Sequence, residues 1–301
     1  MGLEAIPVTG EVCSVDLEYL EPRRLPEAIS LLEQHSCDAL AIAGGTDVLP
    51  GLRSGELAPR YLVDLSKLQE LAGLELTPEG NLRLGASSTF ASLLRSPGIR
   101  RSFPMLSEMA GCMGTPQVRN VATVGGNLCN CSPCADSAPV LLCLNATAHL
   151  QGPAGRRDLP LAKFFLGPGR TALERGEILV ELELPPLPAG AVGSYLKVGR
   201  NRGVDLAVVS LAIVGYRTDD HPSGYGFRIS LGAVAPTPIR AHESEAILAE
   251  RVDEAAVVAA TEAAVNAIQP IGDVRASAAY RTMVARNLTG RAIQQVLRHV
   301  A

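Results

Sequence analysis

The chain has 301 residues, a length that predicts about two domains at roughly 150 residues each. Hydrophobic residues make up 47% and charged residues 19% of the chain, which excludes a disordered protein, and no apolar run reaches the roughly 20 residues that span a bilayer. The 27 Lys and Arg against 31 Asp and Glu give a net charge of −4, so no basic surplus is present for nucleic-acid binding. We therefore expect a folded chain with neither a membrane span nor a nucleic-acid partner.

The N-terminus and the cysteines indicate the compartment. Residues 1–10 lack the positive start and apolar stretch of a secretory signal. The chain has 7 cysteines, an odd number that argues against the disulfide framework of a secreted protein, and five of them fall within residues 112–143. We expect a cytoplasmic protein in which these thiols have another role.

The first third of the chain alternates helical and extended patterns. Residues 22–36 place apolar side chains at helical spacing, with Pro26 near the first turn, and predict a helix. The apolar run 39–43 predicts a strand that ends at Gly44 and Gly45. Further strands are expected at 61–65 and 82–86, and short helical pieces at 92–94 and 98–108.

The middle of the chain contains a second glycine pair. The β-branched run 121–124 predicts a strand that Gly125 and Gly126 close. After this turn, Asp136 is in position to cap a helix that extends to Asn145.

The last third of the chain begins after a stiff break. Residues 178–184 predict a strand, and the proline-rich segment 184–190 that follows it predicts the boundary between two domains. Beyond the boundary, antiparallel strands are expected at 194–198, 207–217 and 227–234, and helices at 255–268 and 274–300. Strands followed by helices predict an α+β second domain.

Residues 42–47 and 123–127 share one order of residue types: an apolar segment, a Gly-Gly pair and a polar residue. Glycine lets the backbone come close to a ligand, and clustered N–H groups bind phosphate oxygens. Two such turns would hold a pyrophosphate between them. Alternatively, each pair only ends a strand, which is a common use of glycine.

Familiar catalytic and nucleotide-binding motifs are missing. No Gly-x-Gly-x-x-Gly follows a strand and no Gly-Lys-Ser/Thr occurs, which disfavours Rossmann and P-loop sites. Neither His-Glu-x-x-His nor Gly-x-Ser-x-Gly occurs, and the 5 histidines are scattered. We therefore assign no catalytic residue to this chain.

Four separated motifs together allow a specific comparison with a known family. They are residues 43–47, residues 118–130 continuing into 132–139, residues 232–238 and residues 274–277. In this order they resemble the FAD-binding medium subunit of the molybdenum hydroxylases, the family of xanthine dehydrogenase and carbon monoxide dehydrogenase. The resemblance implies an α+β fold with a two-subdomain FAD-binding domain of the PCMH (vanillyl-alcohol-oxidase-like) type at 1–186, its subdomains at about 1–66 and 67–186. A smaller C-terminal α+β domain of the carbon monoxide dehydrogenase flavoprotein type is implied at 191–301.

The resemblance also implies which residues contact FAD. The first group would line its adenosine diphosphate part, with glycine N–H groups on the pyrophosphate: Ile42, Ala43, Gly44, Gly45, Thr46, Asp47 and Val48. A second clamp would be formed by Thr123, Gly125, Gly126 and Asn127. The remaining positions are Asp136 near the adenosine end, Leu179 on an apolar strand, and Lys197 near the isoalloxazine, where a cation favours the anionic reduced flavin.

The last three positions have structural alternatives. Asp136 would serve only as a helix cap, Leu179 only as a core residue, and Lys197 only as a solvated strand residue.

The family function implied is electron transfer in a heteromeric oxidoreductase. A large partner subunit with molybdopterin would hydroxylate the substrate, a small partner with two [2Fe–2S] centres would carry electrons, and FAD in this chain would pass them to NAD or another acceptor. This assignment agrees with the missing acid-base constellation. A cofactor-free scaffold subunit and a free-standing flavin oxidase are the alternatives.

Four clustered cysteines leave one further alternative. Cys129, Cys131, Cys134 and Cys143 would supply enough thiolates for an iron–sulfur cluster, as in a branch of the family that resembles 4-hydroxybenzoyl-CoA reductase. That branch uses an inserted loop which this sequence lacks. The other interpretation is that these residues are buried small hydrophobes or loop thiols.

Overall fold

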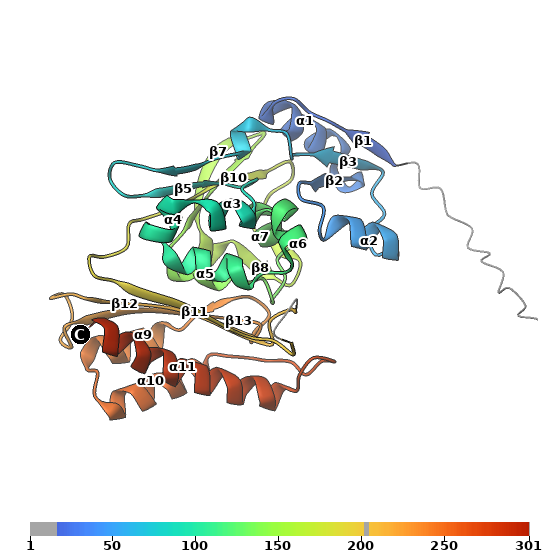
Figure 1. Cartoon of the computed structure of the whole chain (residues 1–301). Coiled ribbons are helices and arrows are strands. Elements are labelled where there is room, and N and C mark those ends of the chain that lie inside the picture. Colours follow the sequence, from blue (N-terminus) through green and yellow to red (C-terminus); the bar gives the residue numbers. More distant parts are fainter. Residues whose placement is uncertain (1–16, 202–204, 301) are drawn as a thin grey trace, which may run out of the picture.

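The computed structural model describes residues 17–201 and 205–300, which form three larger β-sheets and one two-stranded sheet (Figure 1). The N-terminal sheet lies at the upper right of the figure, the second sheet at the top and the third below a layer of short helices. Helices and strands share each part of the chain, which confirms the expected α+β class.

The N-terminal sheet is parallel and has the order β1-β3-β2. Its elements are β1 (Glu18–Leu20), α1 (Leu25–His35), β2 (Ala39–Ile42), α2 (Val48–Ser54) and β3 (Tyr61–Asp64). Helix α1 begins with Pro26 in its first turn, where the fixed proline backbone fits, and packs Ala28 and Ile29 against the sheet. The first glycine pair begins two residues after Ile42, the last residue of β2, and therefore lies at the C-terminal end of a parallel strand, the edge at which ligands commonly bind.

The second sheet has five strands in the order β4-β5-β10-β6-β7, and all neighbouring pairs are antiparallel. Its strands are β4 (Leu74–Leu76), β5 (Leu82–Gly85), β6 (Thr147–Gly152), β7 (Gly155–Pro160) and β10 (Ile178–Leu184). A short hairpin of β8 (Phe165–Gly167) and β9 (Arg170–Thr171) precedes β10.

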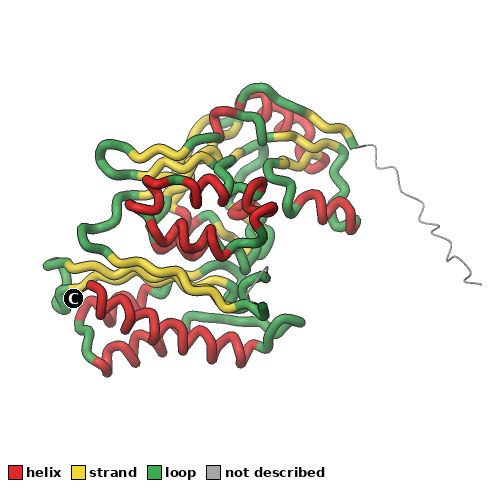
Figure 2. Tube along the Cα trace, viewed as in Figure 1, coloured by secondary structure: helices red, strands yellow, loops and turns green. Residues whose placement is uncertain are grey.

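Six short helices separate β5 from β6 and occupy the middle of the molecule (Figure 2). They are α3 (Phe90–Arg95), α4 (Pro97–Ser102), α5 (Pro104–Cys112), α6 (Pro116–Val121), α7 (Val124–Cys129) and α8 (Ser137–Cys143). Fully buried residues such as Phe90, Leu141 and Leu182 join these helices and the second sheet in one hydrophobic core.

The third sheet is antiparallel with the order β11-β12-β13-β14, and helices cover both of its faces. Its elements are β11 (Val192–Val198), β12 (Val209–Arg217), β13 (Tyr225–Gly232), β14 (Ile239–Arg240), α9 (His242–Glu250), α10 (Glu254–Asn266) and α11 (Ala278–Val300). Because strand side chains alternate, Ala212 and Val214 of β12 face the core under α5 and α8, whereas Leu211 and Ile213 face α9 to α11. The third sheet is thereby fused to the helical layer above it.

The structure corrects the expected strand at 121–124. This run straddles the end of α6 and the start of α7, and only Thr123 makes an isolated bridge, to Thr89. Thr115 and Thr123 cap the two helices through their hydroxyl groups, and Pro116 starts the first of them. The capping residues therefore override the β-branched pattern.

Most other predicted elements are confirmed within a few residues, among them α1, β2, β10, α10 and α11. Among the elements that were not predicted are the helices α2, α6, α7 and α9 and the strands β1, β4, β6 and β7. Within the described residues, no helix is both long enough and apolar enough to cross a membrane.

Candidate functional site

A cavity lies where the first two sheets meet. The end of β2 and the residue after it contribute Ile42 and Ala43, and β10 contributes Ile178 and Leu179. The rest of the wall is formed by Ala41, Leu65, Leu71, Ala86, Ser87, Thr123, Gly125, Gly126, Cys129, Leu173 and Glu177. Parts of both glycine motifs thus face one largely apolar cavity, Ile42 and Ala43 from the first and Thr123, Gly125 and Gly126 from the second, together with Leu179. The predicted site residues that do not line it are Gly44, Gly45, Thr46, Asp47, Val48, Asn127, Asp136 and Lys197.

The first glycine motif forms an open turn beside this cavity. Among the residues that the structure describes, none accepts a hydrogen bond from the N–H groups of Gly44, Gly45, Thr46 and Asp47. Gly45 has a φ of 70°, a left-handed conformation that glycine adopts without strain. Successive N–H groups without protein acceptors at a strand end are suited to bind phosphate oxygens.

Gly44 is required by close packing. A Cβ atom at this position would lie 2.1 Å from the carbonyl oxygen of Val121, at the end of α6. Any side chain would push the turn away from α6, so this glycine sets the distance between the N-terminal sheet and the helical layer.

The second glycine motif differs from the first, although the sequence predicted two similar phosphate-binding turns. The N–H of Gly125 donates to the carbonyl of Ala86 at 2.8 Å, and the N–H of Gly126 donates to Thr123 Oγ1 at 3.0 Å. Asn127 N–H donates to the Thr123 carbonyl. This motif is the first turn of α7, and its N–H groups already bond protein acceptors. It therefore lines the cavity with backbone but provides no second set of N–H donors for phosphate oxygens.

Gly125 is also required by packing, because a Cβ there would lie 2.7 Å from both the Cβ and the carbonyl oxygen of Ala86. The side chain of Asn127 is fixed as well. Its Oδ1 accepts a hydrogen bond of 2.6 Å from the hydroxyl of Ser137, which is completely buried. The amide N–H₂ of Asn127 is thereby directed away from Ser137.

Asp136 and Lys197 meet each other outside the cavity. Lys197 Nζ donates to Asp136 Oδ2 at 2.6 Å, and the Tyr195 hydroxyl donates to Asp136 Oδ1 at 2.6 Å. The two charged side chains are only 9% and 10% exposed. Asp136 occupies the N-cap position of α8, as expected, but its side chain makes no capping hydrogen bond, and Lys197 is not a solvated strand residue. Because the two side chains contact each other, they do not lie at opposite ends of FAD, as the resemblance implied.

The pKa of Asp136 reflects two opposed effects. Burial raises the pKa of this carboxyl above its ordinary value, and the neighbouring Lys197 ammonium lowers it in part. The pKa of Tyr195 is raised well above its ordinary value by burial and by the Asp136 charge. Lys197 also donates to the Cys112 carbonyl at the end of α5, where the helix dipole favours a cation.

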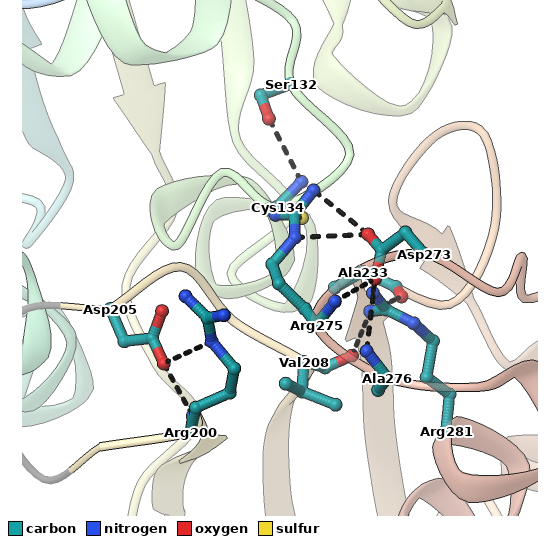
Figure 3. Close-up of polar contacts among 10 residues, drawn as sticks. All are labelled: Ser132, Cys134, Arg200, Asp205, Val208, Ala233, Asp273, Arg275, Ala276 and Arg281. Atoms are coloured by element: carbon teal, nitrogen blue, oxygen red, sulfur yellow. Dashed lines mark hydrogen bonds and ion pairs between the residues drawn. The ribbon is translucent and has the colours of Figure 1, made fainter.

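The cysteines do not converge on one point. Cys131 Sγ donates to the Gly167 and Arg170 carbonyls, Cys143 Sγ donates to the Arg228 carbonyl, and Cys134 Sγ accepts from Arg275 at 3.4 Å (Figure 3). Within residues 17–201 and 205–300 no group of three or more Cys, His, Asp or Glu residues is placed to hold a metal ion. The thiols of Cys129, Cys131, Cys134 and Cys143 therefore provide no common ligand set in this structure.

Several residues of the site were not predicted from the sequence. Ala86 and Ser87 line the cavity because β5 ends beside β10, and a pair of small residues after a strand is a weak signal for this. Glu177 lines it with its carboxylate held by Arg157 at 2.7 Å. Tyr195 lies two residues before Lys197 on the same face of β11, and this alternation could have identified it.

The chain matches two family models. Residues 14–187 match the FAD binding domain in molybdopterin dehydrogenase, and residues 194–296 match the CO dehydrogenase flavoprotein C-terminal domain.

Individual proteins are similar along nearly the whole chain. The xanthine dehydrogenase FAD-binding subunit of Escherichia coli O157:H7 is 34% identical over 281 residues, which is 93% of this chain and 95% of that relative. The carbon monoxide dehydrogenase medium chain of Hydrogenophaga pseudoflava is 34% identical over 278 residues, 92% of this chain and 95% of that relative. In a solved structure of the Hydrogenophaga pseudoflava dehydrogenase, a chain superposes with a TM-score of 0.90 at 34% identity, covering 95% of this chain and 98% of its own length.

Proposed function

The chain belongs to the family of FAD-binding subunits of the molybdopterin dehydrogenases, also called molybdenum hydroxylases, and we propose that it transfers electrons between partner iron–sulfur clusters and an acceptor such as NAD. It is a subunit of an oxidoreductase and its first domain is of the FAD-binding type. We propose the identity of the electron acceptor, the partner subunits and the residues that contact FAD.

The observation that carries the FAD site is the open turn at residues 44–47. Within the described residues its N–H groups have no protein acceptor, and it lies beside a largely apolar cavity, the kind of surface against which planar ring systems pack. FAD combines a pyrophosphate with two such ring systems. We place the pyrophosphate at Gly44, Gly45, Thr46 and Asp47, with Ile42, Ala43 and Val48 supporting the turn.

The second glycine motif is the wall of the proposed site. Gly125 and Gly126 bring the backbone close to the cavity, Thr123 caps α7, and Asn127 presents an amide whose orientation Ser137 fixes. Leu179 supplies apolar contact from β10. These residues exclude water and set the width of the cleft.

Lys197 and Asp136 have an electrostatic role in this proposal. When bound, FAD accepts and releases electrons, and its reduced form carries negative charge. Lys197 lies outside the cavity, and we propose that the isoalloxazine extends toward it, so that its largely buried ammonium stabilises that charge by Coulomb attraction. Asp136 and the Cys112 carbonyl hold the ammonium in position, and the Tyr195 hydroxyl holds Asp136.

The partners are proposed from the names of the relatives. Several are called medium chains or subunits of a complex, which implies larger and smaller companions. We propose a large molybdopterin subunit that hydroxylates the substrate and a small subunit with [2Fe–2S] clusters. Within this chain, we propose a flavin unit at 1–186 and a second unit at 191–301; the cytoplasmic location remains a prediction.

The flavin assignment is tested on the full chain, purified from cells supplied with riboflavin. We expect a flavin absorption spectrum and release of FAD on denaturation. Gly45→Val is expected to lose FAD, because it introduces a β-branched side chain at a φ of 70° beside Leu49. Gly167→Val is the matched control, since nothing lies within 4 Å of a Cβ at Gly167. A chain without FAD, both alone and with its partner subunits, would favour the scaffold alternative.

The acceptor is tested separately. Chemically reduced, FAD-loaded chain is mixed anaerobically with NAD, and reoxidation is followed by the return of flavin absorption. Reoxidation by NAD supports the proposed acceptor. Reoxidation only by a quinone or a dye assigns another class of acceptor and leaves the flavin site intact.

A further inference from the structure

Tyr195 supplies the second of two donors to the buried carboxylate of Asp136. Lys197 Nζ donates to Oδ2 and the Tyr195 hydroxyl donates to Oδ1, both at 2.6 Å. Tyr195 is 5% and Asp136 7% exposed, which leaves bulk water little access to either hydrogen bond. In the described part of the chain, no third side chain donates to Asp136. The charge of this carboxylate therefore depends on one ammonium and one phenol.

The position of the Tyr195 hydroxyl is fixed by the strand that carries it. Strand β11 is an edge strand of the third sheet, and it places Tyr195 opposite Ala212 of β12. The Tyr195 N–H donates to Glu108 Oε2 of α5 at 3.1 Å. Lys197 is two residues further along β11, so both side chains point to the same face of the sheet. The phenol and the ammonium thus reach Asp136 from one strand.

The other titratable groups near this pair come from α5. The Cys112 carbonyl accepts a hydrogen bond from Lys197, and the charges of Lys197 and Asp136 both act on the Cys112 thiol. Glu108, one turn earlier, is bonded to the Tyr195 N–H. Neither side chain donates to the carboxylate, so neither replaces the Tyr195 hydroxyl.

The ion pair is also connected to the wall of the proposed flavin cavity. Ser137, next to Asp136, donates from its buried hydroxyl to Asn127 Oδ1 at 2.6 Å. Asn127 follows Gly126, which lines the cavity. A single hydrogen bond between their neighbours in the chain thus joins Asp136 to the cavity wall.

We propose that Tyr195 is a positioning residue of the flavin site, whose hydroxyl keeps the Asp136 carboxylate charged and directed at Lys197. The proposal rests on the flavin function proposed above, in which the Lys197 ammonium stabilises the reduced cofactor. It adds a residue that acts on the cofactor only through this ion pair.

The expected effect of removing the hydroxyl follows from burial. In Tyr195→Phe, Oδ1 of Asp136 becomes a buried charged oxygen without a donor, which is costly. Burial already raises the pKa of Asp136, and the hydrogen bond from Tyr195 is one of the contacts that lower it. The carboxyl should therefore take up a proton at a higher pH than in wild type, and a protonated Asp136 leaves the charge of Lys197 uncompensated.

The first measurement reads Asp136 through its partner and needs no cofactor. The chain contains only three lysines, Lys67, Lys163 and Lys197, so the Nζ resonance of Lys197 is readily followed by NMR as the pH is varied. We expect a transition as Asp136 ionises, and Asp136→Asn should lack it. In Tyr195→Phe the midpoint should lie about one pH unit higher, the tenfold effect of losing one hydrogen bond to a charged group.

Tyr216→Phe is the matched control. It removes a hydroxyl from the neighbouring strand β12, and Tyr216 packs against the same hydrophobic core as Tyr195. Its NMR midpoint should equal that of wild type.

The second measurement is the midpoint reduction potential of the FAD-loaded full chain at several pH values. An uncompensated Lys197 ammonium favours the negatively charged reduced cofactor, so the potential should fall additionally as Asp136 ionises. We expect this additional fall about one pH unit higher in Tyr195→Phe than in wild type or Tyr216→Phe.

The two measurements separate the outcomes. Equal NMR midpoints for wild type and Tyr195→Phe would overturn the proposal and leave the flavin function standing. A shifted NMR midpoint with identical potential curves would also overturn it, because the ion pair would then have no effect on the flavin. A wild-type chain that never holds FAD would refute the flavin function itself, whatever the NMR titration shows.

Discussion

The Lys197 ammonium lies 2.6 Å from the Asp136 carboxylate, although the two residues are 61 positions apart in the chain. Lys197 comes from β11 of the third sheet, and Asp136 immediately precedes α8 of the helical layer. Both side chains are at most 10% exposed, so this ion pair joins two parts of the molecule in a low-dielectric environment.

Removing one partner of this pair should be costly. Lys197→Met leaves the Asp136 charge buried without its cation, and we expect the free energy of unfolding to fall by about 3 kcal/mol. The double variant Asp136→Asn/Lys197→Met should recover much of this loss, because no buried charge remains. Denaturant unfolding of the three proteins measures the effect.

The control is the exposed ion pair of Lys67 and Glu21, whose side chains are 70% and 52% exposed. Lys67→Met should change the free energy of unfolding by less than about 1 kcal/mol. Equal losses for Lys67→Met and Lys197→Met would show that burial of the Asp136 pair has no energetic consequence.

The contact of Gly44 with Val121 leads to a prediction about the cofactor cleft. In Gly44→Ala the added Cβ would lie 2.1 Å from the Val121 carbonyl oxygen, so the turn must move. We expect a loss of about 1–3 kcal/mol in stability, typical of overpacking, together with weaker FAD retention. Thermal unfolding and flavin content measure both. Gly167→Ala, at an open position, should behave like wild type, and unchanged flavin content in Gly44→Ala would contradict the assignment of this turn.

Asp273 gives the chain a pH-dependent contribution to stability. Hydrogen bonds from the Arg275 and Ala276 N–H groups and the charge of Arg281 lower the pKa of its carboxyl to about 2 (Figure 3). Since the pKa is depressed in the folded state, this stability is complete above the unfolded pKa of about 4 and is lost as the pH falls toward about 2.

We therefore expect Asp273→Asn to differ most from wild type above about pH 4, with a gap that shrinks as the pH approaches about 2. Denaturant unfolding at several pH values measures the gap. Asp219→Asn, at an exposed position, should follow the wild-type curve. A gap for Asp273→Asn that stays constant over this range would refute the assigned linkage.

The thiols should differ strongly in reactivity. Cys37 and Cys112 are exposed, whereas burial raises the pKa of both Cys129 and Cys143 to about 12. Because the thiolate is the nucleophile, iodoacetamide near neutral pH should label Cys37 and Cys112 first in the folded chain, label the partly exposed Cys129 slowly, and reach the buried Cys143 only after unfolding. Peptide mass spectrometry measures the order in which the cysteines are alkylated. Rapid labelling of Cys143 in the native chain, or iron with acid-labile sulfide in anaerobically prepared protein, would contradict this arrangement.

Local sequence patterns predicted a helix or strand correctly where all the local signals, such as hydrophobic spacing and proline positions, indicated the same structure. Strand β10 was predicted over its full length, because its apolar residues are followed at once by prolines that cannot continue a sheet. The run at 121–124 failed, because β-branched residues indicate a strand whereas Thr115, Pro116 and Thr123 start helices. Where these two local signals conflict, the capping residues decide the outcome.

The two glycine pairs mark the limit of sequence reasoning about this protein. The sequence by itself determined the family motifs, their order and the residues that carry them, because these depend on residue types and spacing. Only the tertiary structure decided that, among the residues it describes, the N–H groups at Gly44 and Gly45 have no protein acceptor whereas those at Gly125 and Gly126 are bonded. It also decided that the Asp136 side chain pairs with Lys197 instead of capping α8. The physical reason is that a donor or a charge is satisfied by neighbours from distant parts of the chain, and spacing along the sequence does not identify them.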